Sequence, residues 1–147
     1  MTDLTLPIQP GGLLLDVLVG LNDVLTQGLL DARLPLVRPV KVTAFIDTGA
    51  DVSGISTRLV QTLRLPLAHT LQTVTAGGIA RTSCYEISLS ILNAAGTGIV
   101  FATPNLFVTE MPTPPTGLDA LIGLDIVLQC VLIVDGPNRQ FTLRCPP

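Results

Sequence analysis

The sequence is poor in charge, histidine and cysteine, and each shortage argues against a class of function. Only 13% of its 147 residues are charged, the net charge is −3, and a single lysine accompanies scattered arginines. Nucleic-acid binding needs a concentrated basic surface, so we expect no nucleic-acid partner. One histidine, His69, and three cysteines without metal-ligand spacing do not make a zinc site. We therefore expect no metal, no cofactor and no disulfide framework.

Long apolar runs are also absent. The best candidate, residues 13–19, is interrupted by Asp16, and no basic segment precedes it. A membrane-spanning helix needs about 20 consecutive apolar residues, so the sequence predicts neither a membrane span nor an export signal. We expect Asp16 to face solvent or to pair locally. These patterns predict a protein with no membrane partner, a cytoplasmic location and reduced thiols.

What the sequence does have is apolar residues, which make up 48% of it, with a mean hydropathy of +0.61. A chain of this length forms one domain, here residues 1–147, and can bury a real hydrophobic core. So few polar residues leave too little polar surface for a monomer. Some of the apolar excess is therefore expected to lie in an interface between subunits.

The most informative segment is the run Ala-Phe-Ile-Asp-Thr-Gly-Ala-Asp at residues 44–51. Its three apolar residues predict a buried strand that ends at Asp47, and Gly49 permits a sharp turn or a close approach of the main chain. At the mouth of a buried strand, low dielectric raises the pKa of a carboxyl group that lacks strong hydrogen bonds. Asp47 is therefore the candidate catalytic residue.

Two further motifs follow along the chain. Residues 73–81 contain adjacent glycines between strand-like segments, and residues 120–126 read Ala-Leu-Ile-Gly-Leu-Asp-Ile. Together with the Asp-Thr-Gly loop, they resemble the flap hairpin and the apolar-apolar-glycine segment of retropepsin-like aspartic proteases, the single-domain relatives of pepsin. Residues 134–143 resemble the C-terminal hairpin of bacterial members. The resemblance spans most of residues 40–143.

This resemblance implies an all-β fold, a closed barrel or sandwich with a flap hairpin and one or two short helices, equivalent to one half of the two-lobed pepsin site. It also implies an aspartic endopeptidase that acts on polypeptides. Because the chain has one Asp-Thr-Gly, each of two identical chains must supply one Asp47. The expected partner is thus a second copy, with residues 1–11 and 140–147 at the interface. The two carboxyl groups would share a proton and activate a water.

The motifs also imply roles for individual residues. Thr48, Gly49 and Ala50 support the catalytic loop, and the Thr48 hydroxyl would bond across the two-fold axis. The predicted substrate-binding residues are Asp51, Gly77, Gly78, Ile79 and Ile122, and Gly123 is the structural glycine beside the loop. Many retroviral members carry an arginine after this glycine, where this chain has Leu124. The arginine that braces the acid beside the loop is therefore absent, so we expect the environment of Asp51 and the bracing of the dimer to differ from those of the retroviral members.

Two other interpretations stay open. A dimer of the same fold that binds peptides or acts as a scaffold would need no catalysis, although placing two acids together without a use is costly. In the other, Asp47 is only a turn residue of a β domain, which predicts a monomer. Sedimentation or scattering would separate this last interpretation from the two dimeric ones.

Local patterns complete the expected layout. Strands are expected over residues 2–8, 12–20, 40–46, 70–75, 81–92, 99–108, 118–122, 131–134 and 139–143, with a hairpin tip at 76–80 and a bulge or an edge position at Pro104. Helices are expected over residues 57–65, capped by Ser56, and 124–129. Residues 21–37, with Gly28 and Pro35, are expected to form a loop with no more than one helical turn.

Overall fold

The computed structural model describes the backbone of residues 1–147 and every side chain except those of Thr73 and Thr75. The expected all-β class is confirmed, since strands hold 50% of the residues and helices 14%. The elements, in chain order, are β1 (Thr2–Pro7), β2 (Leu14–Leu21), α1 (Asp23–Asp31), β3 (Val40–Ile46), β4 (Gly54–Ser56), α2 (Thr57–Leu63), β5 (His69–Thr75), β6 (Gly78–Leu92), β7 (Ile99–Met111), β8 (Ala120–Ile122), α3 (Leu124–Val127), β9 (Val131–Asp135) and β10 (Gln140–Cys145).

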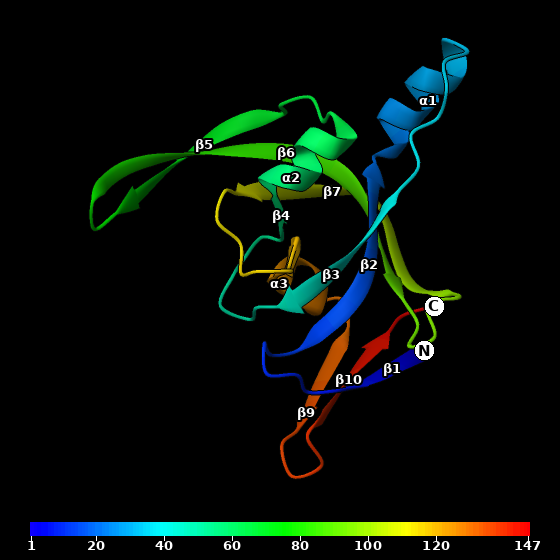
Figure 1. Ribbon diagram of the computed structural model, residues 1–147, viewed down its shortest axis with the longest axis vertical. Coiled ribbons are helices and arrows are strands. Elements are labelled where there is room, and N and C mark those ends of the chain that lie inside the picture. Colours follow the sequence, from blue (N-terminus) through cyan, green and yellow to red (C-terminus); the bar gives the residue numbers. More distant parts are fainter.

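Six strands close into a barrel. Their order is β2-β3-β8-β4-β7-β6, and a further pairing of β6 with β2 joins the two ends (Figure 1). Alternate residues of these strands point inward, and among them Val17, Ile55 and Ile87 have no exposed surface. Closure removes the free edges that an open sheet would present, so the barrel is a stable frame for the loops at its ends.

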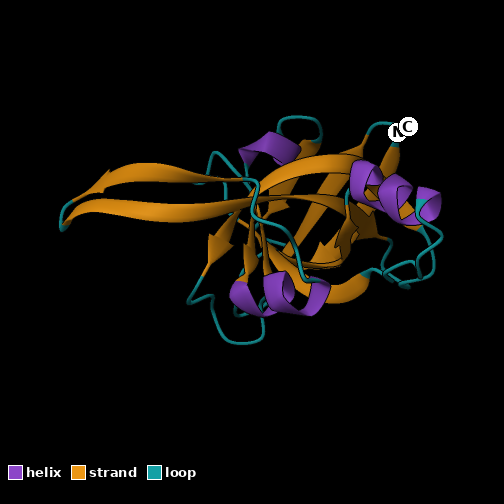
Figure 2. Ribbon diagram, turned by 90° about the horizontal axis from the view of Figure 1, so that it is seen from above, coloured by secondary structure: helices purple, strands orange, loops and turns teal.

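Strand β5 lies outside this closed ring and pairs only with β6 in the sheet order. Figure 2 shows the resulting hairpin as a long arm that projects away from the barrel. Its turn is tighter than the predicted tip at 76–80, because Thr75 already pairs with Gly78 and only Ala76 and Gly77 lie between the strands. Gly78 takes a φ of +117°, which glycine adopts readily and other residues rarely do.

A second, three-stranded sheet has the order β1-β10-β9 and lies below the barrel in Figure 1. Its inner face carries Leu4, Phe141 and Leu143, which join the barrel core. The two chain ends lie side by side, because Thr2 pairs with Cys145. The predicted C-terminal hairpin is therefore present, and both edges of β10 are already occupied within one chain.

The helix predicted over residues 57–65 is confirmed as α2. Its cap is Ser56, whose Oγ accepts a hydrogen bond from the Leu59 N–H at 3.2 Å. The same hydroxyl donates to Asp119 Oδ1 at 2.8 Å, and the Arg58 guanidinium donates to both oxygens of that carboxylate. The bonds from Arg58 hold the pKa of Asp119 below its usual value. Side chains thus link α2 to the segment that precedes β8.

The prediction for residues 21–37 is wrong, because the structure has a nine-residue helix there. Asn22 caps α1 by accepting a hydrogen bond from the Leu25 N–H at 2.9 Å. This cap outweighs the low helix propensity of Gly28, and Pro35 lies beyond the C-terminus of the helix, where it interrupts nothing. None of the helical residues is buried, so α1 stands away from the barrel (Figure 1).

The bulge expected at Pro104 is confirmed, although β7 runs unbroken through it. The register of β6 and β7 shifts between Ile87, which pairs with Leu106, and Leu89, which pairs with Thr103. Two residues on β7 therefore oppose one on β6. The ladder skips the position where proline has no N–H to donate.

Candidate active site

Strand β3 delivers Asp47 to one end of the barrel. It pairs in parallel with β8, with Ile46 opposite Ile122, and the Asp47 N–H donates to the Ile122 carbonyl at 2.9 Å. Ala44 and Ile122 are fully buried, whereas Asp47 is half-buried. The strand thus runs from the core to the surface of the barrel between Ala44 and Asp47. Its last hydrogen bond fixes the position of the Asp47 backbone.

A tight turn follows immediately. The Asp47 carboxylate accepts a hydrogen bond from the Gly49 N–H at 2.9 Å, and the Ala50 N–H donates to the Asp47 carbonyl at 3.2 Å. A Cβ at Gly49 would lie 3.2 Å from Asp47 Oδ1, so the glycine serves a close approach and not a positive φ. Thr48 and Gly49 are exposed. The carboxylate is therefore held by its own loop while the turn above it faces outward.

The other oxygen of this carboxylate and the neighbouring Thr48 hydroxyl have no partner among the residues that the structure describes. No described side chain donates to Asp47 Oδ2, and no described residue forms a hydrogen bond with the Thr48 hydroxyl. Ala50 has no side-chain donor to offer. One carboxylate oxygen and one hydroxyl are thus available to a substrate, a water or a second chain.

Gly123 lies directly beneath the loop. A Cβ on it would lie 2.8 Å from the Ala50 carbonyl oxygen and 2.9 Å from the Val52 carbonyl carbon, both of them backbone atoms. The next residue, Leu124, donates its N–H to that Ala50 oxygen at 2.8 Å. The two segments predicted to lie together therefore do so, and only glycine permits this separation.

Ser53 and Asp125 brace the loop in this chain, which has Leu124 where many retroviral members have an arginine. Asp125 accepts two hydrogen bonds from Ser53, one from the N–H at 2.9 Å and one from Oγ at 2.7 Å. The same Oγ accepts the Gly123 N–H at 3.0 Å, and Ser53 has no exposed surface. The Asp125 N–H also donates to the Asp51 carbonyl at 3.2 Å. These bonds join the descending end of the loop to the start of α3.

Neither Ser53 nor Asp125 is among the site residues that the motifs predict. The available signal was the position of Asp125, an acid two residues after a glycine whose usual arginine neighbour is absent. Ser53 gave none, since a serine near a turn is ordinary.

The predicted substrate-binding residues are spread over three places. Asp51 is exposed on the loop, and Ile122 is fully buried in β8. Gly77, Gly78 and Ile79 lie at the end of the hairpin, where the Ile79 side chain is 73% exposed. The hairpin extends on the side of the barrel where the loop between β3 and β4 lies (Figure 1). In this arrangement Ile79 points into solvent, so the contacts predicted for these residues remain predictions.

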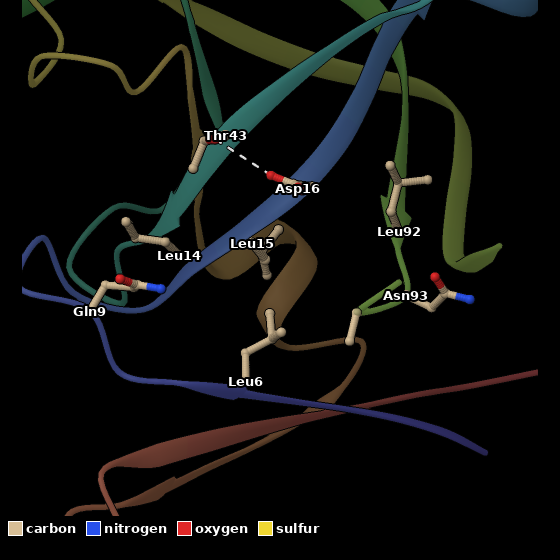
Figure 3. Close-up of a pocket in the computed structure, with 9 residues that line it drawn as sticks. Leu6, Gln9, Leu14, Leu15, Asp16, Thr43, Leu92 and Asn93 are labelled. Carbon is tan, nitrogen blue, oxygen red and sulfur yellow. Dashed lines mark hydrogen bonds between the residues drawn. The ribbon is translucent and has the colours of Figure 1, made fainter. Parts of the chain in front are cut away.

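A separate cavity of about 250 Å³ lies between the terminal sheet and the barrel (Figure 3). Leu6 and Leu15 form part of its wall, and no residue of the Asp47 loop lines it. Asp16 at its rim accepts a hydrogen bond from Thr43 at 3.4 Å and pairs with Lys41 at 3.6 Å. The local pairing expected for Asp16 is thus confirmed, and the cavity is not the candidate active site.

Metal-binding clusters and membrane-spanning helices are two further features that bear on function. Among the residues that the structure describes, no three His, Cys, Asp or Glu side chains gather in a group that would hold a metal ion. Within the same set, no helix is long and apolar enough to cross a membrane.

Comparison with known proteins gives consistent results. Residues 37–126 match the family described as Aspartyl protease. A retropepsin-like aspartic protease from Rickettsia conorii superposes with a TM-score of 0.60 at 15% identity, over 98% of this chain and 91% of that one. The retroviral protease-like domain of Ddi1 from Leishmania major gives a TM-score of 0.42 at 19% identity, over 92% and 95%, which is too low to support an inference. A search of curated proteins found no match. The expected retropepsin-like fold is therefore confirmed.

Proposed function

Since this chain belongs to the aspartyl protease family, we propose that it is an aspartic endopeptidase whose catalytic residue is Asp47. The observation that supports this most strongly is the difference in hydrogen bonding between the two oxygens of its carboxylate. Oδ1 is fixed by the Gly49 N–H at 2.9 Å, while no described side chain donates to Oδ2. A carboxylate with one anchored and one open oxygen is oriented for proton transfer.

The proposed reaction needs two such carboxyl groups. Two acids about 3 Å apart cannot both ionise cheaply, so they share one proton. The ionised Asp47 takes a proton from a water whose oxygen attacks the scissile carbonyl carbon. The protonated Asp47 of the partner subunit donates to the carbonyl oxygen. The tetrahedral intermediate then releases the amine, whose nitrogen takes the proton that Asp47 accepted from the water. One hydroxyl of the intermediate returns a proton to the partner's Asp47 as the carboxylic acid product forms, so the dyad regains its single shared proton.

A homodimer supplies the second acid, because the chain carries a single Asp-Thr-Gly. The Thr48 hydroxyl is exposed and has no hydrogen-bond partner in the described part of the chain, as a bond across a two-fold axis would require. Residues 1–11 and 140–147 are the segments predicted from the resemblance to lie at the interface. In the protomer β1 and β10 pair with each other, so β10 has no free edge to offer.

We propose a further contact on strand β9, because β1 and β9 are the two outer strands of this sheet and each keeps one open edge. Its outer face exposes Val131 by 44% and Ile133 by 45%, and Leu128, just before it, is 78% exposed. Leu128 donates its N–H to the Leu124 carbonyl in α3, only a few residues after Gly123. An apolar strip that begins at the end of α3 and an unpaired strand edge together suit a second copy of this chain.

The β5–β6 hairpin is the proposed flap. Val74 and Ile79 face each other across it and are 88% and 73% exposed. Apolar side chains in solvent at the end of a long arm have surface to bury when peptide binds. Asp51, exposed on the loop, is proposed to contact the substrate backbone.

The decisive experiment mixes parent and Asp47→Asn chains. The amide oxygen of asparagine can still accept the Gly49 N–H, so the loop keeps its shape while the proton relay is lost. Chains unfolded together and refolded at equal amounts would form parent dimers as about a quarter of the total. Activity on a peptide library should fall to that fraction of an all-parent sample. Retention of about half would mean that each chain works alone, and an inactive parent would favour a binding or scaffolding dimer.

A variant of β9 tests the interface separately. Ile133→Asp should weaken the dimer in sedimentation experiments, because a charge would replace an apolar side chain at the strand edge. Leu36→Asp is the matched control, since Leu36 is comparably exposed, at 54%, but lies beyond α1. Equal dimer affinity for the parent and the Ile133 variant would remove β9 from the interface.

A further inference from the structure

Two of the three cysteines lie against each other beside the terminal sheet. The Sγ atoms of Cys130 and Cys145 are 4.0 Å apart, and both thiols are free. The register of β9 and β10 pairs Val131 with Arg144, so one further step sets Cys130 opposite Cys145. Directly opposed residues in antiparallel strands have Cα atoms about 4.5–5.5 Å apart, within the range that a disulfide requires. We propose that Cys130 and Cys145 are a disulfide-forming pair that closes on oxidation.

The two thiols differ in access to solvent. Cys145 has no exposed surface, whereas Cys130, between α3 and β9, is half-buried. Burial raises the pKa of both thiols, that of Cys145 to about 12. Cys130 is therefore the sulfur that an oxidant in solution reaches first, and Cys145 is the resolving thiol. Without an oxidant the disulfide cannot form, and with one the reaction is slow because both sulfurs are protonated near neutral pH.

A small-molecule disulfide such as glutathione disulfide is the oxidant class that fits this order. The Cys130 thiolate, its proton released to solvent, attacks one glutathione sulfur and expels the other glutathione as a thiolate. The Cys145 sulfur passes its proton to that thiolate and attacks Cys130 Sγ, which breaks the mixed disulfide and releases the second glutathione. Two protein thiols are oxidised to one disulfide, and one glutathione disulfide is reduced to two thiols.

The bond would close a ring that contains β9, the following turn and β10. It would join the C-terminal strand to the end of α3, the helix whose first residues bond to the active-site loop. This reinforcement needs only one protomer, so the inference does not depend on the proposed peptidase activity. Cys84 takes no part, because it is buried in the barrel on β6, where it pairs with His69 and Thr109.

The test is to incubate the full chain with glutathione disulfide and then denature it in N-ethylmaleimide. The reduced protein should take three maleimide groups and the oxidised protein one, with the loss of two hydrogens and a cross-linked peptide containing Cys130 and Cys145. Closing a loop of this length should raise Tm by roughly 6–12 °C, reversibly on reduction. The Cys84→Ser variant should behave like the parent, apart from carrying one fewer maleimide.

Several results would overturn the proposal. They are three maleimide groups after oxidation, a stable glutathione adduct on Cys130 without ring closure, or a disulfide between chains on a non-reducing gel. Cys130→Ser and Cys145→Ser should each abolish the rise in Tm, and a rise that persists in either variant would show another cause. The mass measurement uses the parent chain, so the proposal stays testable even if a serine variant folds poorly.

Discussion

Replacing Gly123 by alanine tests the contact on which the geometry of the active-site loop depends. The added Cβ would meet the Ala50 carbonyl oxygen at 2.8 Å, the Val52 carbonyl carbon at 2.9 Å and the Val52 oxygen at 3.0 Å. All three are backbone atoms of the loop, so no side-chain rotation relieves the contact. Either the loop or the start of α3 must move.

The cost follows from two effects. Overpacking of this kind costs about 1–3 kcal/mol, and weakening the 2.8 Å hydrogen bond from Leu124 to Ala50 costs about 1 kcal/mol more. We therefore expect the free energy of unfolding to fall by about 2–4 kcal/mol. Asp47 lies in the same turn, and a displacement on the order of 1 Å at a reacting group costs about 100-fold in rate. The activity of Gly123→Ala should fall by at least that factor.

Urea unfolding and kcat/KM on one peptide, measured on the same preparations, give both quantities. Gly28→Ala is the control, because a Cβ there meets no heavy atom within 4 Å and the residue lies inside α1. That variant should gain about 0.5–1 kcal/mol of stability and keep its activity. A Gly123→Ala protein as stable and as active as the parent would refute the close packing of these segments.

Three further predictions concern pH and the hairpin. Ala50→Ser would introduce a hydroxyl able to donate to the Asp47 carboxylate, so both limbs of the kcat/KM profile, expected around pH 4–6 in the parent, should move to lower pH; an unchanged profile would mean that Ala50 does not neighbour the dyad. Arg58→Ala should cost about 1 kcal/mol at neutral pH. Because Arg58 lowers the pKa of Asp119 in the folded state, this loss should disappear as pH falls below about 4, and a loss constant down to pH 2 in thermal unfolding would contradict the ion pair. Gly78→Ala, at a φ of +117°, should reduce kcat/KM more than stability, and normal turnover would make the hairpin end a passive turn.

Local chemistry explains which parts of the fold could be predicted. The β3 strand and its turn are specified by a short apolar run followed by Asp47 and Gly49, and α2 by the Ser56 cap and its apolar face. Asn22 is a signal of the same kind, since its side chain caps the start of α1 despite the low helix propensity of Gly28. The prediction failed there because Gly28 and Pro35 argue against a helix, whereas Pro35 lies beyond its end and Leu25 and Leu29, four residues apart, share a half-buried face of α1.

Long-range pairings account for what the sequence did not reveal. Closure of the barrel through β2 and β6, and the position of β10 between β1 and β9, depend on strands far apart in the chain. The brace between Ser53 and Asp125 joins residues separated by 72 positions, and neither has an unusual local context. Such pairs are set by the global packing that brings two backbones together, so a motif identifies one member at most.

The two sides of the loop differ in how many hydrogen bonds they make within one chain. Beneath the loop, Ser53 and Gly123 are buried and hydrogen-bonded, and no buried polar side-chain atom that the structure describes lacks a partner. Above it, the Thr48 hydroxyl is exposed, and no residue that the structure describes forms a hydrogen bond with it. A loop held by hydrogen bonds from below and exposed above fits the proposed site shared between two chains. In the proposed dimer, the hydrogen-bonded side of the loop would fix the position of Asp47 before association, so that pairing two chains need only bring the carboxylates together.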